Sequence, residues 1–302
     1  MVFALRKFSF KCKMIHEKKI YENKIYDEER ALYDIENADV KNCTFAGPAD
    51  GESALKECKN IKVESCLFEL RYPFWHVSGA EIWSVTMTET CRAALWYDEY
   101  IGIEESKLHG IKALRECKHI TLSRCDIDSE EFGWRCDNVE ISGVTLKSMY
   151  PFFECKNMKI YDLTMTGKYS FQYVENVEIK NSHFKTKDAF WHSKNVTVYD
   201  SVIEGEYLGW YSENLHLVRC HIKGTQPLCY CKNLILEDCT CEDCDLSFER
   251  SEVEATVKGN IVSVKNPVSG FIKADSIGEI IFDEKHKISS TCKVEITKTV
   301  TH

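Results

Sequence analysis

The stretch KDAFWHSKNVTVYDSVIEG, residues 187–205, decides the fold. It holds the tripeptide Phe190-Trp191-His192, followed after Asn195 by the apolar–x–apolar pair Val196 and Val198. The same tripeptide occurs as Phe74-Trp75-His76, again just ahead of an alternating run. Two copies of an unusual tripeptide in one chain indicate an internal repeat, and the repeat has to be defined before any chemistry is assigned.

A period of nineteen residues runs through most of the chain. Steps of nineteen from Asn195 reach an asparagine at five further positions, and two insertions lengthen the steps near the N-terminus. Asparagine favours turns and can bond the backbone and its stacked neighbours, so we expect this marker column to be scaffold. The twelve markers are Asn37, Asn60, Gly79, Tyr100, His119, Asn138, Asn157, Asn176, Asn195, Asn214, Asn233 and Glu252.

Every unit repeats the same apolar positions around its marker. An apolar–x–apolar pair follows the marker, and further apolar or small residues stand six and eight positions after it and five before it. Three short period-two segments separated by turn residues predict three short strands per coil, with no room for a helix. Leucine-rich repeats need a helical return and left-handed hexapeptide coils need multiples of six, so both are excluded.

These observations predict an all-β fold, a single-stranded right-handed parallel β-helix of about twelve coils of nineteen residues. The repeat covers residues 31–252. Residues 1–30, in which residues 8–15 alternate weakly, are expected to cap the first coil. Beyond Glu252 the period fails, and residues 253–302 are expected to form an irregular β segment that covers the open strand edges at the other end.

The repeat region resembles the pectin-lyase-like superfamily of right-handed β-helices. Its segments also resemble an uncharacterised bacterial family known only as a domain of unknown function, which implies the fold and brings no activity. The segments that carry this resemblance are GPADGESALKECKN, RYPFWHV, CRAALWY, HGIKALRECK, TKDAFWHSKN, GEYLGWYSEN and GTQPLCYCKN.

Composition restricts the partners. The 302 residues carry a net charge of −9, and an acidic surface repels phosphate backbones, so we expect no nucleic-acid partner. No apolar run approaches the ~20 residues that span a bilayer, and no signal peptide is recognisable, so we expect no membrane partner and a cytoplasmic location.

The sixteen cysteines are expected to be free thiols that fill the core. Cys229, Cys231, Cys239, Cys241 and Cys244 imitate a zinc motif, but the repeat distributes them over different columns. Tetrahedral coordination needs ligands that converge on one point. We therefore expect no metal and no cofactor, with Cys231 and Cys239 inside and Cys229 outside the coil.

Two adjacent columns carry the candidate binding residues. The column four positions before the marker contains Lys, Arg and Gln, so strand alternation places it outside, next to an inward column that contains Phe190. The alternative is that this column faces inward. The outward placement predicts an exposed aromatic ladder, ~34 Å long over seven coils, formed by Trp75, His76, Trp96, Tyr97, Trp134, Phe153, Tyr173, Trp191, His192, Trp210 and Tyr211.

Catalysis has weaker support. Arg115, Glu116, Arg135 and Glu154 interrupt the ladder and are the best acid–base candidates along it. Glu116 and Glu154 lie two coils apart, ~9.6 Å along the backbone, at the wide limit of the roughly 6.5–9.5 Å used by inverting glycosidases. An alternating surface ion-pair ladder explains the same residues.

The best prediction from the sequence is a cytoplasmic carbohydrate-binding platform that uses the aromatic ladder. The alternative is a structural or interaction protein whose aromatic face contacts a partner or forms a homodimer. A polysaccharide lyase or hydrolase is the third reading. The chain is expected to be a monomer or a homodimer.

Overall fold

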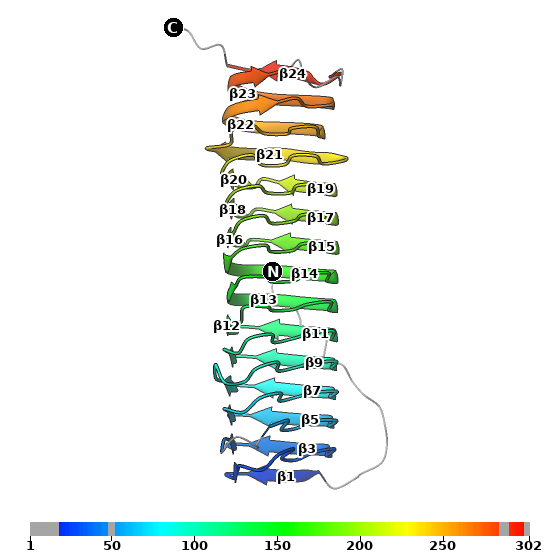
Figure 1. Ribbon diagram of the computed structural model, residues 1–302, viewed down its shortest axis with the longest axis vertical. Coiled ribbons are helices and arrows are strands. Elements are labelled where there is room, and N and C mark those ends of the chain that lie inside the picture. The colour runs from blue at the N-terminus through cyan, green and yellow to red at the C-terminus, as the bar shows by residue number, and fades with distance from the viewer. Residues whose placement is uncertain (1–17, 48–51, 284–289, 299–302) are drawn as a thin grey trace.

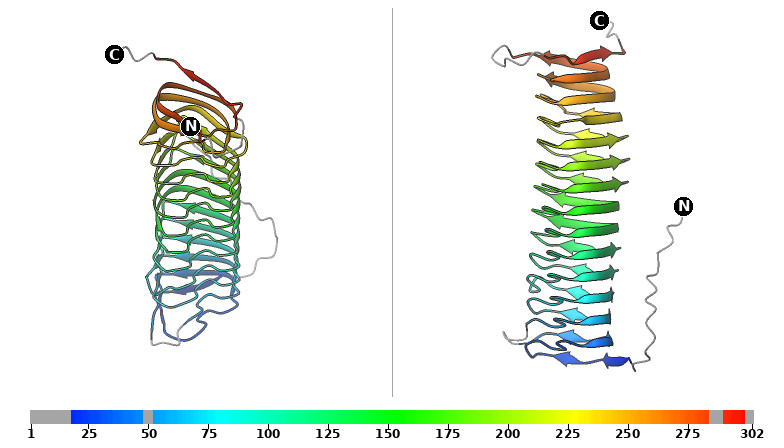
Figure 2. Two further views of the ribbon diagram at one scale, coloured as in Figure 1. Left: turned by 45° about the horizontal axis from the view of Figure 1, so that its top comes forward. Right: turned by 90° about the vertical axis from the view of Figure 1, so that its right-hand side faces the viewer.

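The computed structural model describes residues 18–47, 52–283 and 290–298, so the alternating segment 8–15 lies outside the described residues. Within them, every strand pairs in parallel with a strand of the neighbouring coil, and no helix is present. Figure 1 and Figure 2 show the strands stacked along one long axis, from β1 at one end to β24 at the other. The predicted parallel β-helix is confirmed.

The first side of the solenoid carries the longer strands. Within the described residues they are β1 (Lys19–Glu22), β3 (Glu36–Lys41), β5 (Lys59–Glu64), β7 (Ser78–Trp83), β9 (Glu99–Glu104), β11 (Lys118–Ser123), β13 (Asp137–Ser148), β14 (Lys156–Gly167), β15 (Glu175–Lys180), β17 (Lys194–Tyr199), β19 (Glu213–Val218), β21 (Leu234–Glu242), β22 (Glu252–Lys265), β23 (Ser269–Ile281) and β24 (Lys293–Ile296). The strands between β1 and β24 contribute alternate side chains to the core, as Ile61 and Val63 of β5 do.

The second side carries strands of two or three residues. They are β2 (Ile25–Tyr26), β4 (Thr44–Phe45), β6 (Leu67–Phe68), β8 (Thr86–Met87), β10 (Lys107–Leu108), β12 (Asp126–Asp128), β16 (His183–Lys185), β18 (Val202–Glu204) and β20 (His221–Lys223). In β13 and β14 one continuous strand of twelve residues serves both sides.

The strand register reproduces the sequence repeat. Ile120 pairs with Val139, nineteen residues later, and the two predicted insertions appear as steps of 23 and 21 residues at β3–β5 and β7–β9. Eleven of the twelve markers lie in strands β3 to β22 of the first side, and Asn233 directly precedes β21. We expected caps over residues 1–30 and 253–302. The parallel pairing continues through the described parts of both regions, from β1 to β24.

The third side of each coil differs from a regular strand. It consists of turns, and single parallel bridges join them only from Trp75 through Trp96 and Arg115 to Trp134 in the described part of the chain. Phe74 and His76 both adopt a positive φ of 58°, in the left-handed region. A strand ladder needs consecutive extended residues, so this alternating backbone limits the pairing to at most one residue per coil.

The core contains stacked columns of apolar side chains. The predicted inward phenylalanines are fully buried, and Phe171 stacks on Phe152 and on Phe190 with ring centroids 5.0 and 5.1 Å apart. The thiol columns are buried as well, including Cys58, Cys117 and Cys231.

The asparagine column lies on the surface, and from Asn157 to Asn233 each side chain bonds the next. Asn176 donates to the Oδ1 of Asn157 at 3.1 Å and accepts from Asn195 at 3.0 Å. Asn176 has a φ of 58°, and Gly79 holds the same column position with a φ of 78°. Asparagine and glycine are the residues that tolerate this left-handed backbone best, which explains the marker.

Candidate functional site: the aromatic face

Two neighbouring columns on the third side of the coils form a surface that we call the aromatic face. The inner column stands four positions before the marker: Lys56, Trp75, Trp96, Arg115, Trp134, Phe153, Gln172, Trp191 and Trp210. The outer column stands three positions before it: Glu57, His76, Tyr97, Glu116, Arg135, Glu154, Tyr173, His192, Tyr211 and Tyr230.

The inner column is half-buried rather than exposed, which corrects the expected placement of its tryptophans. Each indole N–H donates to a backbone carbonyl of the next coil: Trp75 to Ala93 at 2.6 Å, Trp96 to Lys112 at 2.7 Å, Trp134 to Tyr150 at 2.7 Å, Trp191 to Tyr207 at 2.9 Å and Trp210 to Gln226 at 2.8 Å. The amide of Gln172 makes the equivalent bond to Asp188 at 3.3 Å. These bonds tie successive coils together, so the inner column has a structural role.

The faces of the indole rings are covered. Trp75 and Trp96 stack with centroids 5.2 Å apart and planes 4° apart, and Trp191 and Trp210 stack at 5.6 Å and 2°. The far side of Trp96 is occupied by the guanidinium of Arg115, 4.8 Å from the ring centroid. Solvent therefore reaches mainly the ring edges of this column.

The outer column is the exposed part of the face. Tyr97, Tyr173 and Tyr211 are 39, 48 and 45% exposed, and His76 and His192 are also exposed. These rings stack along the solenoid as well, with His192 lying 5.0 Å from both Tyr173 and Tyr211. The hydroxyl and imidazole groups thus form a row with one polar tip per coil.

A third aromatic column borders the face and was missed in the sequence. Seven positions before the marker stand Tyr72, Tyr150, Tyr169 and Tyr207, and Tyr72 and Tyr207 contact Trp75 and Trp210 at 5.2 and 5.4 Å. The same nineteen-residue step would have revealed this column.

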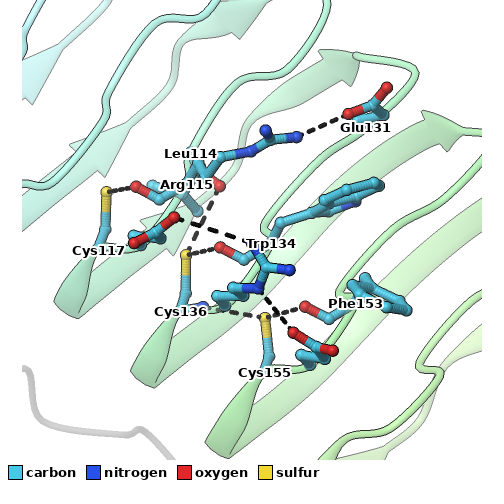
Figure 3. Close-up of polar contacts among 11 residues, drawn as sticks. Leu114, Arg115, Cys117, Glu131, Trp134, Cys136, Phe153 and Cys155 are labelled. Atoms are coloured by element: carbon cyan, nitrogen blue, oxygen red, sulfur yellow. Dashed lines mark hydrogen bonds and ion pairs between the residues drawn. The ribbon is translucent and has the colours of Figure 1, made fainter.

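Arg115 is held within the inner column rather than available as a base. Its guanidinium lies between the rings of Trp96 and Trp134, at 4.8 and 4.5 Å, and donates to Glu131 at 2.6 Å. Figure 3 shows this ion pair beside Trp134 and Phe153, which belong to the next two coils. Arg115 therefore continues the stack across the middle of the face.

The other catalytic candidates form an ion-pair ladder on the surface. Arg135 donates from Nε to Glu154 at 2.6 Å, and its Nη1 lies 4.0 Å from Glu116. The bond to Glu154 raises the pKa of Arg135. One guanidinium thus neutralises both carboxylates, and the arrangement is explained by the alternating surface ladder without a catalytic role.

The described cysteines are free thiols that bond to backbone carbonyls, as Cys117 does to Leu95 at 3.0 Å. Burial raises the pKa of Cys58 and of Cys229 to about 12, so both thiols stay protonated at neutral pH. The placement of Cys229 outside the coil was wrong. It is fully buried because the segment around Leu246, whose carbonyl accepts its thiol at 3.6 Å, packs over it.

The described part of the chain contains no group of three or more His, Cys, Asp or Glu side chains that could hold a metal ion. The same residues contain no helix with the length and apolar character of a membrane span.

Fold and site together define a β-helical solenoid protein with an aromatic outer face. The chain belongs to the family described as "Protein of unknown function (DUF3737)", whose model matches residues 19–295. No curated protein matches the sequence significantly.

Solved structures share the solenoid architecture at low sequence identity. The surface adhesin PfbA of Streptococcus pneumoniae is 10% identical with a TM-score of 0.44, and the match covers 88% of this chain and 83% of PfbA. The A-module of the mannuronan C-5 epimerase AlgE6 of Azotobacter vinelandii is 9% identical with a TM-score of 0.32, covering 87 and 89%. The tailspike of Escherichia coli bacteriophage HK620, solved with a hexasaccharide, is 7% identical with a TM-score of 0.30, covering 92 and 70%.

Proposed function

We propose that the protein is a non-catalytic binding protein, that the aromatic face is its binding surface, and that the ligand is another protein surface. The outer column carries this proposal, because it presents exposed aromatic and charged side chains in one row along the solenoid. A large exposed aromatic surface usually marks an interaction site. Tyrosine and arginine, which are enriched at the energetic centres of protein interfaces, both occur in the row.

The covered ring faces favour a protein over a sugar. A sugar ring binds an aromatic side chain by lying against the face of that ring. In the stack of Tyr173, His192, Tyr211 and Tyr230, neighbouring rings lie 4.9–5.0 Å apart and cover one another. Ring edges, hydroxyls and imidazole nitrogens remain free, and these groups suit the hydrogen bonds and edge contacts of a protein interface.

Carbohydrate binding is the second candidate, and the row of polar tips favours it. Each coil offers one hydroxyl, imidazole, carboxylate or guanidinium group, and successive stacked rings lie about 5.0 Å apart. A hydroxyl-rich polymer lying along the solenoid would meet one donor or acceptor per coil.

A matched pair of variants tests the face. The double variant His192→Ala/Tyr211→Ala removes two rungs of the outer column, and Tyr161→Ala removes a tyrosine that is 46% exposed on another side. Light scattering measures self-association, calorimetry with a panel of oligosaccharides measures glycan binding, and hydroxyl-radical footprinting in a cell extract measures whether a partner covers the face.

If self-association or footprint protection is lost in the double variant and kept in Tyr161→Ala, the result supports a protein as the ligand. Loss of glycan binding in the double variant alone supports the second candidate. If the double variant behaves like wild type and like Tyr161→Ala in all three measurements, the aromatic face is not the binding surface and the proposal fails.

A further inference from the structure

We infer that the occupant of the aromatic face is a second copy of this chain, docked antiparallel about a two-fold axis midway between the rungs of Arg135 and Glu154. The inference rests on the proposed function and names the partner for it. It comes from the order of residues along the outer column. From Glu57 to Tyr230 the column reads Glu, His, Tyr, Glu, Arg, Glu, Tyr, His, Tyr, Tyr, and reversing it about the point between Arg135 and Glu154 sets each rung against a different, complementary residue type.

A two-fold axis that lies in the interface, perpendicular to the solenoid, reverses the order of the coils and keeps each column opposite itself. With the axis between Arg135 and Glu154, each of ten rungs meets a defined rung of the second copy. The opposed residues are Arg135 and the partner's Glu154, Glu116 and the partner's Tyr173, Tyr97 and the partner's His192, His76 and the partner's Tyr211, and Glu57 and the partner's Tyr230, each pair occurring twice.

Every one of these pairs is chemically complementary. The centre contains two ion pairs between Arg135 and the partner's Glu154, which extend the ion pair that each chain makes internally. A tyrosine hydroxyl can donate to the opposed carboxylate of Glu116 or Glu57, and tyrosine meets histidine in the remaining pairs. No like charges oppose each other in the outer column over these ten rungs, which span nine steps of ~4.8 Å, roughly 43 Å.

The inner column is also complementary to itself under the same two-fold rotation. Its aromatic rungs oppose aromatic rungs, and its central cation, Arg115, opposes its one amide, Gln172. The opposed aromatic pairs are Trp134 and the partner's Phe153, Trp96 and the partner's Trp191, and Trp75 and the partner's Trp210.

A third column selects this register. One position before the marker, charges alternate along the solenoid and pair within the chain, as Lys118 does with Glu99 at 3.4 Å and Lys156 with Glu175 at 3.4 Å. The same axis opposes Asp137 to the partner's Lys156, Lys118 to the partner's Glu175, and Glu99 to the partner's Lys194. Like charges meet in this column at the outermost of the ten rungs, where Lys59 opposes the partner's Lys232.

Other registers are less complementary. An axis through the rung of Arg135 itself would oppose Arg135 to Arg135 and Lys118 to Lys156, which like-charge repulsion disfavours. An axis one rung lower, between Glu116 and Arg135, would place Trp75 opposite Gln172, whereas Lys59 meets a lysine of the partner in either register.

Site-directed cross-linking tests the geometry. Chains carrying Tyr97→Cys and chains carrying His192→Cys are mixed and treated with a short bis-maleimide, which joins two thiols by addition without an oxidant. Facing sheets pack about 10 Å apart, within its reach. Wild type measures the background from native cysteines, and Tyr97→Cys mixed with Tyr161→Cys is the matched control.

We expect light scattering to give twice the chain mass of 35.0 kDa and the Tyr97→Cys/His192→Cys mixture to cross-link at least tenfold more than the control. Arg135→Glu should raise the dimer Kd tenfold or more, and Arg135→Glu/Glu154→Arg should restore it. Cross-linking of Tyr97→Cys with itself, or preferentially with Glu154→Cys, would overturn the antiparallel register while the face stays an interface.

A monomeric protein would overturn the homodimer. If that monomer binds a glycan or another protein and loses it in His192→Ala/Tyr211→Ala, the dimer alone has failed and the aromatic face remains the binding surface. If those substitutions change nothing, the proposed function has failed as well.

Discussion

Phe190 and Trp191 are neighbours in one tripeptide, yet their side chains have different tasks. Phe190 is fully buried and stacks on Phe171 with centroids 5.1 Å apart. Trp191 is half-buried, stacks on Trp210 at 5.6 Å and donates its indole N–H to Tyr207 at 2.9 Å. One residue fills the core and the next ties coils together. The exposed chemistry therefore falls to the third residue of the tripeptide, His192.

The largest effect should come from the core side of this comparison. Phe190→Ala removes a ring from a continuous stack and leaves a cavity between coils, so we expect a loss of ~3–5 kcal/mol in the free energy of unfolding. Chemical denaturation measures it, with Phe190→Leu as the control that keeps most of the volume. If Phe190→Ala costs no more than changes at Trp191, the distinction between the two columns is wrong.

Asp98 offers a second test, because it is a carboxyl group in the buried column that otherwise holds Cys58, Val77 and Cys117. It is fully buried. Oδ1 accepts the N–H of Val77 at 2.8 Å, and Oδ2 has no partner among the described residues. Burial raises its pKa well above the usual range. Asp98→Cys supplies a thiol that can accept from Val77 as Cys117 accepts from Asp98, and should stabilise the protein by ~1–3 kcal/mol at neutral pH.

The stabilisation produced by Asp98→Cys should increase as the pH rises. A raised folded-state pKa means that the native protein keeps a proton that the unfolded chain releases above about pH 3.9. Wild type therefore loses stability as the pH rises from that value toward neutrality, and Asp98→Cys removes the loss. Thermal unfolding across this range should show a difference that grows with pH. A constant difference would mean that Asp98 is ionised in the folded protein.

The arrangement of the coils could be predicted from the sequence because a strict period determines which side chains stack on one another. Stepping by nineteen residues identified both insertions and the inward phenylalanines, and the register of β3–β5 and β7–β9 agrees. The period could not reveal that Phe74 and His76 are left-handed, which replaces the expected third strand by single bridges.

The candidate site was predicted less completely. Alternation distinguishes inward from outward positions, but it does not give the direction of an outward side chain. The indoles turn toward a carbonyl of the next coil, as Trp191 does toward Tyr207, and so are half-buried. Cys229 was misplaced because its environment depends on how the segment around Leu246, in the next coil, packs over it, and the period does not show this.

A smaller effect should come from the bond that ties Trp191 to the next coil. Trp191→Phe keeps an aromatic ring against Trp210 and removes the indole N–H, so the carbonyl of Tyr207 loses its partner. We expect a cost of ~0.5–1.5 kcal/mol in the free energy of unfolding, measured by denaturation. Tyr161→Ala, at an exposed position without this bond, should change stability by less than ~0.5 kcal/mol. Equal costs would show that the bond contributes nothing.

The smallest effect should come from the surface ladder of asparagines, where backbone conformation and side-chain bonding can be separated. Asn176→Gly removes the exposed bonds to Asn157 and Asn195 and keeps the left-handed φ of 58° accessible. We expect it to cost no more than ~0.5 kcal/mol, because exposed polar groups exchange their partners for water.

Asn176→Ala loses the same bonds and keeps a Cβ in the left-handed region without the polar side chain that lets asparagine tolerate it, so we expect it to cost ~1–2 kcal/mol more than Asn176→Gly. Chemical denaturation of the two variants under the same conditions therefore shows whether the marker column is needed for its backbone conformation or for its side-chain bonds. If alanine is clearly worse than glycine, the column is selected for its backbone conformation. If both are equally destabilising by more than ~1 kcal/mol, the side-chain ladder itself holds the coils together, and the surface contributes to stability more than its exposure suggests.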